Sequence, residues 1–109
     1  MPVNYKVLGQ SNPSATTATT LYTVPSSTSA VVSTIAVCNQ GASAATFRIA
    51  IRPAGVSLAA QHYIAYDSSI TANNTTFITI GATLATTDVI TVYASNTSLS
   101  FSAFGTEIS

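Results

Sequence analysis

The clearest structural signal in the chain lies in residues 30–52, which read AVVSTIAVCNQGASAATFRIAIR. Successive side chains of a β-strand point to opposite faces, so residues 30–39 predict a strand with Val31, Ile35 and Val37 on one face. The even-numbered residues form the other face, which ends at Cys38. Both faces are apolar enough to be covered, and Cys38 is therefore expected to be a small core residue.

Residues 46–52 predict a second, half-buried strand with Phe47, Ile49 and Ile51 on its inner face. Asn39-Gln-Gly41 lies between the two strands and is typical of a turn, because asparagine and glycine tolerate the backbone angles that tight turns require. The pattern therefore predicts that the two strands form a hairpin.

The same pattern of strands and turns extends over the rest of the chain. Valine, isoleucine and threonine, which suit pleated strands, make up 36 of the 109 residues. Further strands are expected at residues 4–9, 20–25, 61–67, 75–80, 89–95 and 98–104. We therefore predict an all-β protein with about eight short antiparallel strands in a β-sandwich, of jelly-roll or immunoglobulin-like type.

The last two expected strands have well-defined inner faces. The residues expected to face the core are Ile90, Val92 and Ala94 in one strand and Leu99, Phe101 and Ala103 in the other. Asn96-Thr-Ser98 separates the two strands and is expected to close a hairpin between them.

Residues 1–109 are expected to form a single domain, since a chain of this length matches one ordinary domain. Residues 10–20 contain no large apolar side chain and cannot anchor themselves to a core. They are expected to form a long polar loop or a threonine-rich edge strand, or else an extended arm that becomes ordered on a neighbouring molecule.

Charged residues are unusually scarce, at 6% of the chain with a net charge of zero. They are Lys6, Arg48, Arg52, Asp67, Asp88 and Glu107. Three scattered cations cannot neutralise a phosphate backbone, so the sequence argues against a nucleic-acid partner. No apolar run is long enough for a membrane span and no signal peptide is recognisable, so we expect a soluble protein made in the cytoplasm.

The sequence offers little chemistry for catalysis. A single cysteine and a single histidine, Cys38 and His62, exclude a disulfide framework and leave almost nothing to bind a transition metal. The Gly-x-Ser-x-Gly motif of many hydrolases is absent, and His62 is expected to be packed or solvated. We therefore expect no enzymatic activity and no cofactor.

The low charge density points instead to binding. A folded chain of this mass has an accessible surface of about 5,600 Å², or roughly 900 Å² for each charge. One side of a standard protein–protein interface covers about 800 Å². A complete interface could therefore form almost anywhere while removing at most one charge from water, which avoids the cost of burying an unpaired ion.

Several segments carry a resemblance to a known group of proteins. These are Leu21-Tyr-Thr-Val-Pro25, residues 30–39 and 44–51, His62-Tyr63, Leu84–Tyr93 and Phe101–Ile108. Together they resemble small virion structural proteins of tailed bacteriophages, cyanophages among them, over about residues 5–109. The resemblance implies a β-sandwich that decorates or cements a capsid, often as a trimer, or that forms part of a tail or baseplate. Its motifs are strand and turn patterns, so they assign no functional residue.

The resemblance and the low charge density together predict a capsid decoration, or cement, protein. It would bind the lattice of the major capsid protein as a homotrimer on the virion surface, after synthesis in the host cytoplasm. The candidate contact residues are Arg48 and Arg52, on one face of their strand, and Tyr5, Phe104 and Glu107 near the termini.

Two alternatives remain open. The chain could be a tail, neck, baseplate or fibre component, with the same sandwich bound to another tail protein. It could also be a carbohydrate-binding module that stacks a sugar ring on Tyr63, Tyr66 or Tyr93, although it has no tryptophan and few acidic residues.

Overall fold

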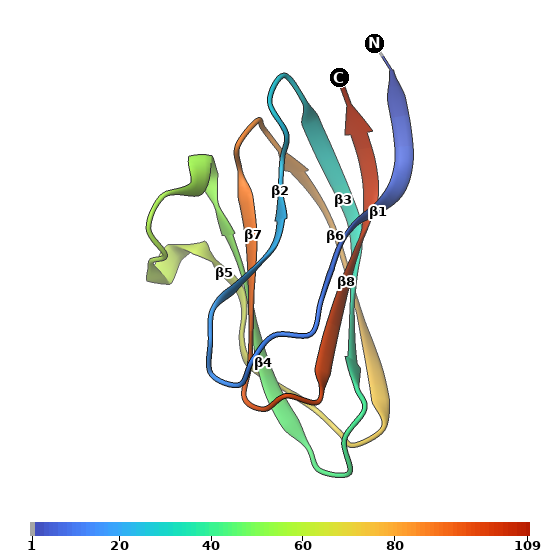
Figure 1. Cartoon of the computed structure of the whole chain (residues 1–109), viewed down its shortest axis with the longest axis vertical. Helices are drawn as coiled ribbons and strands as arrows, with labels where there is room; N and C mark the ends of the chain where they lie inside the picture. The colour runs from blue at the N-terminus through green and yellow to red at the C-terminus, as the bar shows by residue number, and fades with distance from the viewer. Residues whose placement is uncertain (1) are drawn as a thin grey trace.

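The computed structural model describes residues 2–109, and β-strands are its main secondary structure (Figure 1). The strands are β1 (Val3–Ser11), β2 (Thr19–Thr23), β3 (Ser29–Asn39), β4 (Ala45–Arg52), β5 (Tyr63–Ile70), β6 (Asn74–Leu84), β7 (Val89–Ala94) and β8 (Leu99–Ile108). Two single-turn 3₁₀ helices, η1 (Pro53–Gly55) and η2 (Ala60–His62), lie between β4 and β5. The eight strands confirm the all-β prediction. No helix in the described part of the chain is long and apolar enough to cross a membrane.

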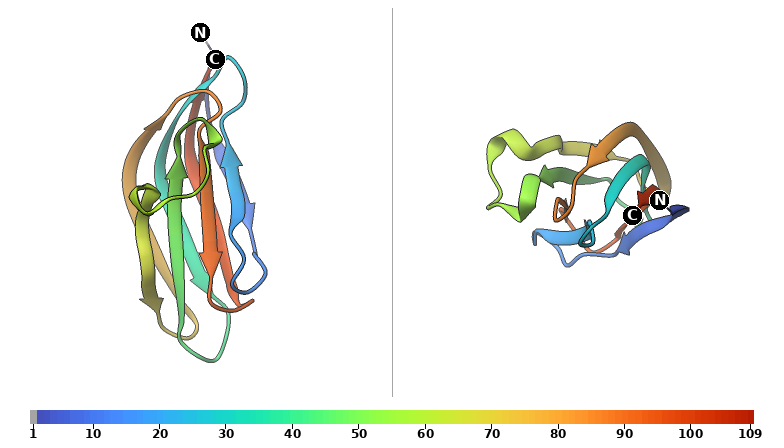
Figure 2. Two further views of the ribbon diagram at one scale, coloured as in Figure 1. Left: turned by 90° about the vertical axis from the view of Figure 1, so that its left-hand side faces the viewer. Right: turned by 90° about the horizontal axis from the view of Figure 1, so that it is seen from above.

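The strands form two four-stranded antiparallel sheets that pack face to face (Figures 1 and 2). The first sheet has the order β1-β8-β3-β6 and the second has the order β2-β7-β4-β5. Consecutive strands alternate between the sheets except at β4 and β5, which are neighbours in the second sheet. This strand order is that of a jelly roll, the first of the two sandwich types expected.

The two hairpin predictions are wrong. Asn39-Gln-Gly41 connects β3 in the first sheet to β4 in the second, and Asn96-Thr-Ser98 connects β7 in the second sheet to β8 in the first. A turn signal reverses the chain direction, but it does not determine whether the next strand pairs with the previous one or crosses the core. In a jelly roll nearly every turn crosses.

Asn39 organises the crossings at this end of the sandwich. Its side chain is 1% exposed. The amide Nδ2 lies within hydrogen-bonding distance of the carbonyl oxygens of Ile70 (3.3 Å) and Thr71 (3.2 Å), and Oδ1 accepts bonds from Gly41 N and Ser98 Oγ, both at 2.9 Å. One buried amide therefore joins three connections that are far apart in sequence.

The core lies between the sheets and contains the predicted inner faces of β7 and β8. All six of those inward residues are fully buried: Ile90, Val92, Ala94, Leu99, Phe101 and Ala103. Phe101 meets Phe47 of the opposite sheet edge to face, with ring centroids 6.2 Å apart. The predicted inner face of β4 is also confirmed for Phe47 and Ile49, while Ile51 is partly buried.

A β-bulge at Ser33 changes the phase of β3. The register of β3 shifts there against both β6 and β8. Val32 faces the core before the bulge and Ile35 faces it afterwards, so the uniform alternation predicted for residues 30–39 is wrong. The same shift places Cys38 on the outer face, partly exposed, and corrects the expectation that it lies in the core.

Residues 10–20 form the end of β1, a loop and the start of β2, and the loop bridges the two sheets. The Asn12 amide Nδ2 donates a hydrogen bond to the carbonyl oxygen of Leu99 at 2.6 Å. The Thr16 backbone N–H donates to the carbonyl oxygen of Ala94 at 2.8 Å. In this structure the segment is therefore fastened to the sandwich of its own chain.

Candidate interaction surfaces

The described residues contain no cluster of side chains that could hold a metal ion. No group of three or more histidine, cysteine, aspartate or glutamate side chains comes together within residues 2–109. His62 is buried, and its Nδ1 accepts a hydrogen bond from the backbone N–H of Ala59 at 3.0 Å. The features that stand out are the outer faces of the two sheets.

The outer face of the first sheet carries no charged side chain. Along β3 and β8 its residues alternate with inward-facing ones, and the register places the corresponding residues of β1 and β6 beside them. They are Val3, Tyr5, Val7 and Gln10 of β1; Ser29, Val31, Thr34, Ala36 and Cys38 of β3; Thr75, Phe77, Thr79 and Thr83 of β6; and Ser100, Ser102, Phe104, Thr106 and Ile108 of β8. We call this surface the uncharged face.

Most of the large apolar side chains of the uncharged face lie in one half of it. Val7 lies opposite Phe104, and Tyr5 lies opposite Thr106, which places Tyr5 and Phe104 on one diagonal of the β1–β8 ladder. Tyr5 is 84% exposed and Phe104 is 36% exposed. The apolar cluster, as we name it, consists of Val3, Tyr5, Val7, Val31, Phe104 and Ile108. The structure thus brings together two of the five candidate contact residues.

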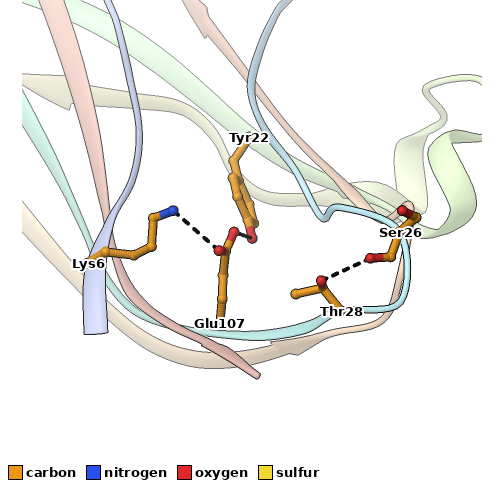
Figure 3. Close-up of polar contacts among 5 residues, drawn as sticks. All are labelled: Lys6, Tyr22, Ser26, Thr28 and Glu107. Carbon is orange, nitrogen blue, oxygen red and sulfur yellow. Dashed lines mark hydrogen bonds and ion pairs between the residues drawn. The ribbon is translucent and has the colours of Figure 1, made fainter. Parts of the chain in front are cut away.

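Glu107, a third candidate, points between the sheets instead of outward (Figure 3). Its Oε2 accepts a 2.6 Å hydrogen bond from the phenol of Tyr22, on β2 of the other sheet, and its Oε1 lies 3.3 Å from Lys6 Nζ. The hydrogen bond from Tyr22, followed by the contact with Lys6, lowers the pKa of Glu107. Burial, followed by the bond to Glu107, raises the pKa of Tyr22.

Arg48, a fourth candidate, lies on the outer face of the second sheet. Its Nε donates to Asp67 Oδ1 at 2.7 Å. The guanidinium carbon lies 4.2 Å from the ring centre of Tyr66 and 4.3 Å from that of Tyr93, so two aromatic rings flank the cation. The hydrogen bond to Asp67 raises the pKa of the Arg48 guanidinium.

Arg52, the fifth candidate, fastens the turn that follows β4. Its Nε donates to Thr91 Oγ1 and its Nη1 to the carbonyl oxygen of Val56, both at 3.0 Å. Both arginines therefore already have partners within this chain, on the face opposite the apolar cluster.

A shallow hollow lies beside Arg48. It has a volume of about 650 Å³ and is lined by Leu58, Ala59, Ala60, Tyr63 and Tyr66. The rings of Tyr63 and Tyr66 meet edge to face with their centroids 4.9 Å apart. Two of the three tyrosines expected to stack on a sugar therefore line the hollow, while Tyr93 lies against Arg48.

Sequence reasoning missed Phe77, which is 68% exposed on β6. The pattern of this strand could not identify its outer face, because large apolar residues occupy both alternating phases: Phe77 in one, and Ile78 and Ile80 in the other. The register places Phe77 opposite Ala36 on the outer face of β3, and its exposure shows that it faces solvent.

No protein-family model matches the chain, and no curated protein matches it. Among solved structures, it is similar to a chain in the structure of infectious bursal disease virus, Gx strain. The TM-score is 0.58 at 13% sequence identity, over 97% of this chain and 32% of the viral chain. This chain therefore spans about a third of the viral chain, and the two share a fold.

Proposed function

We propose that the chain is a structural protein of a virus particle, and more specifically a decoration protein that binds the major capsid protein of a tailed bacteriophage. It acts by binding alone, without catalysis or a cofactor. The proposal rests mainly on the uncharged face, a four-stranded surface on which no ion has to leave water when a partner covers it.

The size of this face suits an interface. Strands about 4.8 Å apart and ten residues long at about 3.3 Å per residue give four strands an area of roughly 650 Å². One side of a standard interface is about 800 Å², so the uncharged face and its margins are large enough. The apolar cluster supplies aromatic and aliphatic contacts of the kind that dominate binding energy.

The fold supports a virion role. Jelly rolls recur in viral capsid domains, and the similar chain described above belongs to a virus structure. Bound at joints between capsid subunits, the protein would raise the free energy needed to separate them, because it binds the assembled lattice and not separate subunits.

The decisive experiment is to locate the protein in purified heads and tails by mass spectrometry. The proposal predicts that it copurifies with heads and binds emptied heads that lack it. Tyr5→Lys and Phe104→Lys should each weaken this binding, while Thr20→Lys, at an exposed residue of β2 on the other sheet, should leave it unchanged. A protein missing from both fractions would contradict any virion role.

Recovery with tails would instead favour the alternative of a tail, neck, baseplate or fibre component. The uncharged face would serve equally well there, since its chemistry does not identify the partner.

The hollow favours a second candidate function, a carbohydrate-binding module, because Tyr63 and Tyr66 line it beside the Arg48–Asp67 pair. Aromatic rings can stack on sugars while planar polar groups bind their hydroxyls. A glycan array tests this function, and Tyr66→Ala should abolish any signal. An array without binding would exclude it.

A further inference from the structure

The four edge strands of the sandwich differ in how they are protected against pairing with another strand. The edge strands are β1 and β6 in the first sheet and β2 and β5 in the second. Unprotected edges pair with other chains, and proteins prevent this with charges, bulges and short strands. β1 carries Lys6 and a register shift before Gly9, β2 has five residues, and β5 carries Asp67 at a positive φ of 51°.

β6 has none of these protections over residues 74–79. It is eleven residues long with no charge and no proline, and its sequence, NTTFITIGATL, is rich in strand-forming residues. Its one sheet neighbour among the described strands is β3. The regular part begins after the turn residue Asn73, with φ of 53°, and ends before Gly81, with φ of 56°.

One hydrogen bond determines which backbone groups of β6 are free. Gln40 N donates to the carbonyl oxygen of Ser98 at 2.9 Å, and these residues continue the register of β3 with β8. Hydrogen-bonded pairs alternate along an antiparallel ladder. The backbone N–H and C=O groups of the even-numbered residues in 34–40 therefore form hydrogen bonds with β8. Those of the odd-numbered residues in 35–39 form hydrogen bonds with β6.

The register carries this alternation across to β6. Val37 lies opposite Thr76, so the backbone groups of Thr76 and of every second residue from it point towards β3. The N–H and C=O groups of Thr75, Phe77 and Thr79 therefore point away from the sheet, at its open edge.

We propose that β6 is a self-association edge, on which the β6 strand of a second copy of this chain pairs antiparallel about a two-fold axis at Phe77. Phe77 of one copy would lie opposite Phe77 of the other, and Thr75 opposite Thr79. These three pairs would form six backbone hydrogen bonds, two for each bonded pair. They would join the two first sheets into one continuous eight-stranded sheet.

The chemistry of the strand suits a second copy. A two-fold axis places the residues beside it next to their own symmetry mates, so a charge close to the axis would face an identical charge. Residues 74–79 carry none, and the two Phe77 rings would form a cross-strand aromatic pair. Phe77 is the middle residue of 74–80, the regular part of the strand, so an axis there allows the whole of that part to pair.

This inference goes beyond the proposed function and does not depend on it. A two-fold contact is complete with two copies. The homotrimer expected from the sequence would need a head-to-tail contact instead, so this inference departs from that expectation. The contact area is below that of a standard interface, and we expect weak association in solution.

Sedimentation velocity of the purified chain tests the inference. Between about 10 µM and about 1 mM, the weight-average mass should rise from 11.1 kDa towards twice that value. Phe77→Lys should keep the protein monomeric by placing two cations together at the axis. Thr75→Pro should weaken pairing by removing an edge N–H that the β3 ladder does not use.

Ile64→Lys is the matched control, because Ile64 is also a large apolar side chain, 47% exposed, on an edge strand, β5. It should associate like the unaltered protein, and all variants should keep their far-UV circular dichroism. Amide hydrogen exchange should slow at Thr75, Phe77 and Thr79 as concentration rises. A monomer at about 1 mM, a trimer, or a dimer that survives both β6 substitutions would overturn the inference.

Discussion

The Tyr22 phenol donates a 2.6 Å hydrogen bond to Glu107 Oε2, and this contact joins two residues that are 85 positions apart and belong to opposite sheets. Figure 3 shows Glu107 between Tyr22 and Lys6. Four of the six charged side chains form ion pairs, Lys6 with Glu107 and Arg48 with Asp67, and neither pair contributes to the uncharged face. The outer surface of the first sheet is therefore free of charge in part because Glu107 points inward.

Tyr22→Phe removes the hydrogen bond but keeps the packing of the ring. A hydrogen bond to a charged group contributes about 1.5–3 kcal/mol, so for this partly buried bond the free energy of unfolding should fall by up to about that amount. Urea denaturation monitored by circular dichroism measures it. Tyr5→Phe, at an 84% exposed residue, is the control and should change little. Equal effects of the two substitutions would show that the bond contributes nothing.

The same contact predicts how stability depends on pH. The pKa of Glu107 is lowered from its ordinary value of 4.5, so its contribution is complete above that pH and is lost as pH falls through the lower folded value. The pKa of Tyr22 is raised from 10.0, so its contribution is complete below pH 10 and is lost as pH rises further. Glu107→Gln should flatten the acid limb of the stability profile. Tyr22→Phe should flatten the alkaline limb and also part of the acid limb, because the bond from Tyr22 is the largest cause of the lowered pKa of Glu107. Profiles parallel to that of the unaltered protein would contradict this assignment.

Asn39→Ala should be among the most destabilising polar substitutions. It removes an amide that is 1% exposed and leaves the Gly41 N–H and the carbonyl oxygens of Ile70 and Thr71, in two connections, without this partner. Each unpaired buried group costs about 1–3 kcal/mol, so we expect a loss of at least about 3 kcal/mol in urea unfolding. Asn74→Ala removes an exposed asparagine and should cost less than about 1 kcal/mol. A small effect at Asn39 would mean that water replaces the amide.

Two glycines should respond differently to alanine. A Cβ at Gly105 would collide with the backbone carbonyl oxygen of Val31, whereas at Gly81 it would meet no atom within 4 Å and only the φ of 56° would be strained. Gly105→Ala should therefore cost more than about 3 kcal/mol, because a strand backbone has to move. Gly81→Ala should cost about 1 kcal/mol. Thermal and urea unfolding compare the two, and similar losses would be inconsistent with the close approach at Gly105.

Attachment through the uncharged face should depend little on ionic strength. With no ion at the contact, affinity for emptied heads should change by less than about tenfold between low and high salt. Binding of the purified protein at several salt concentrations measures this. A loss of about a thousandfold would indicate electrostatic attachment and would favour Arg48 and Arg52, on the second sheet, as the contact residues.

Much of the fold could be predicted from local patterns. Alternation within β7 and β8 identified inward residues such as Val92 and Phe101, since side-chain period depends only on the strand itself. The candidate site was harder to predict. Tyr5 and Phe104 were identified as candidates, but their position on one diagonal depends on how β1 pairs with β8.

The amino-acid sequence alone determined that this chain forms eight strands with an apolar interior and very few charges, because backbone preference and side-chain periodicity are properties of short segments. Tertiary structure alone decided which strands share a sheet, since that choice depends on burying two sheets against each other across the whole chain. It also decided that the bulge at Ser33 turns Cys38 outward, and that Glu107 meets Tyr22 inside the sandwich. These relationships join residues that no local pattern connects.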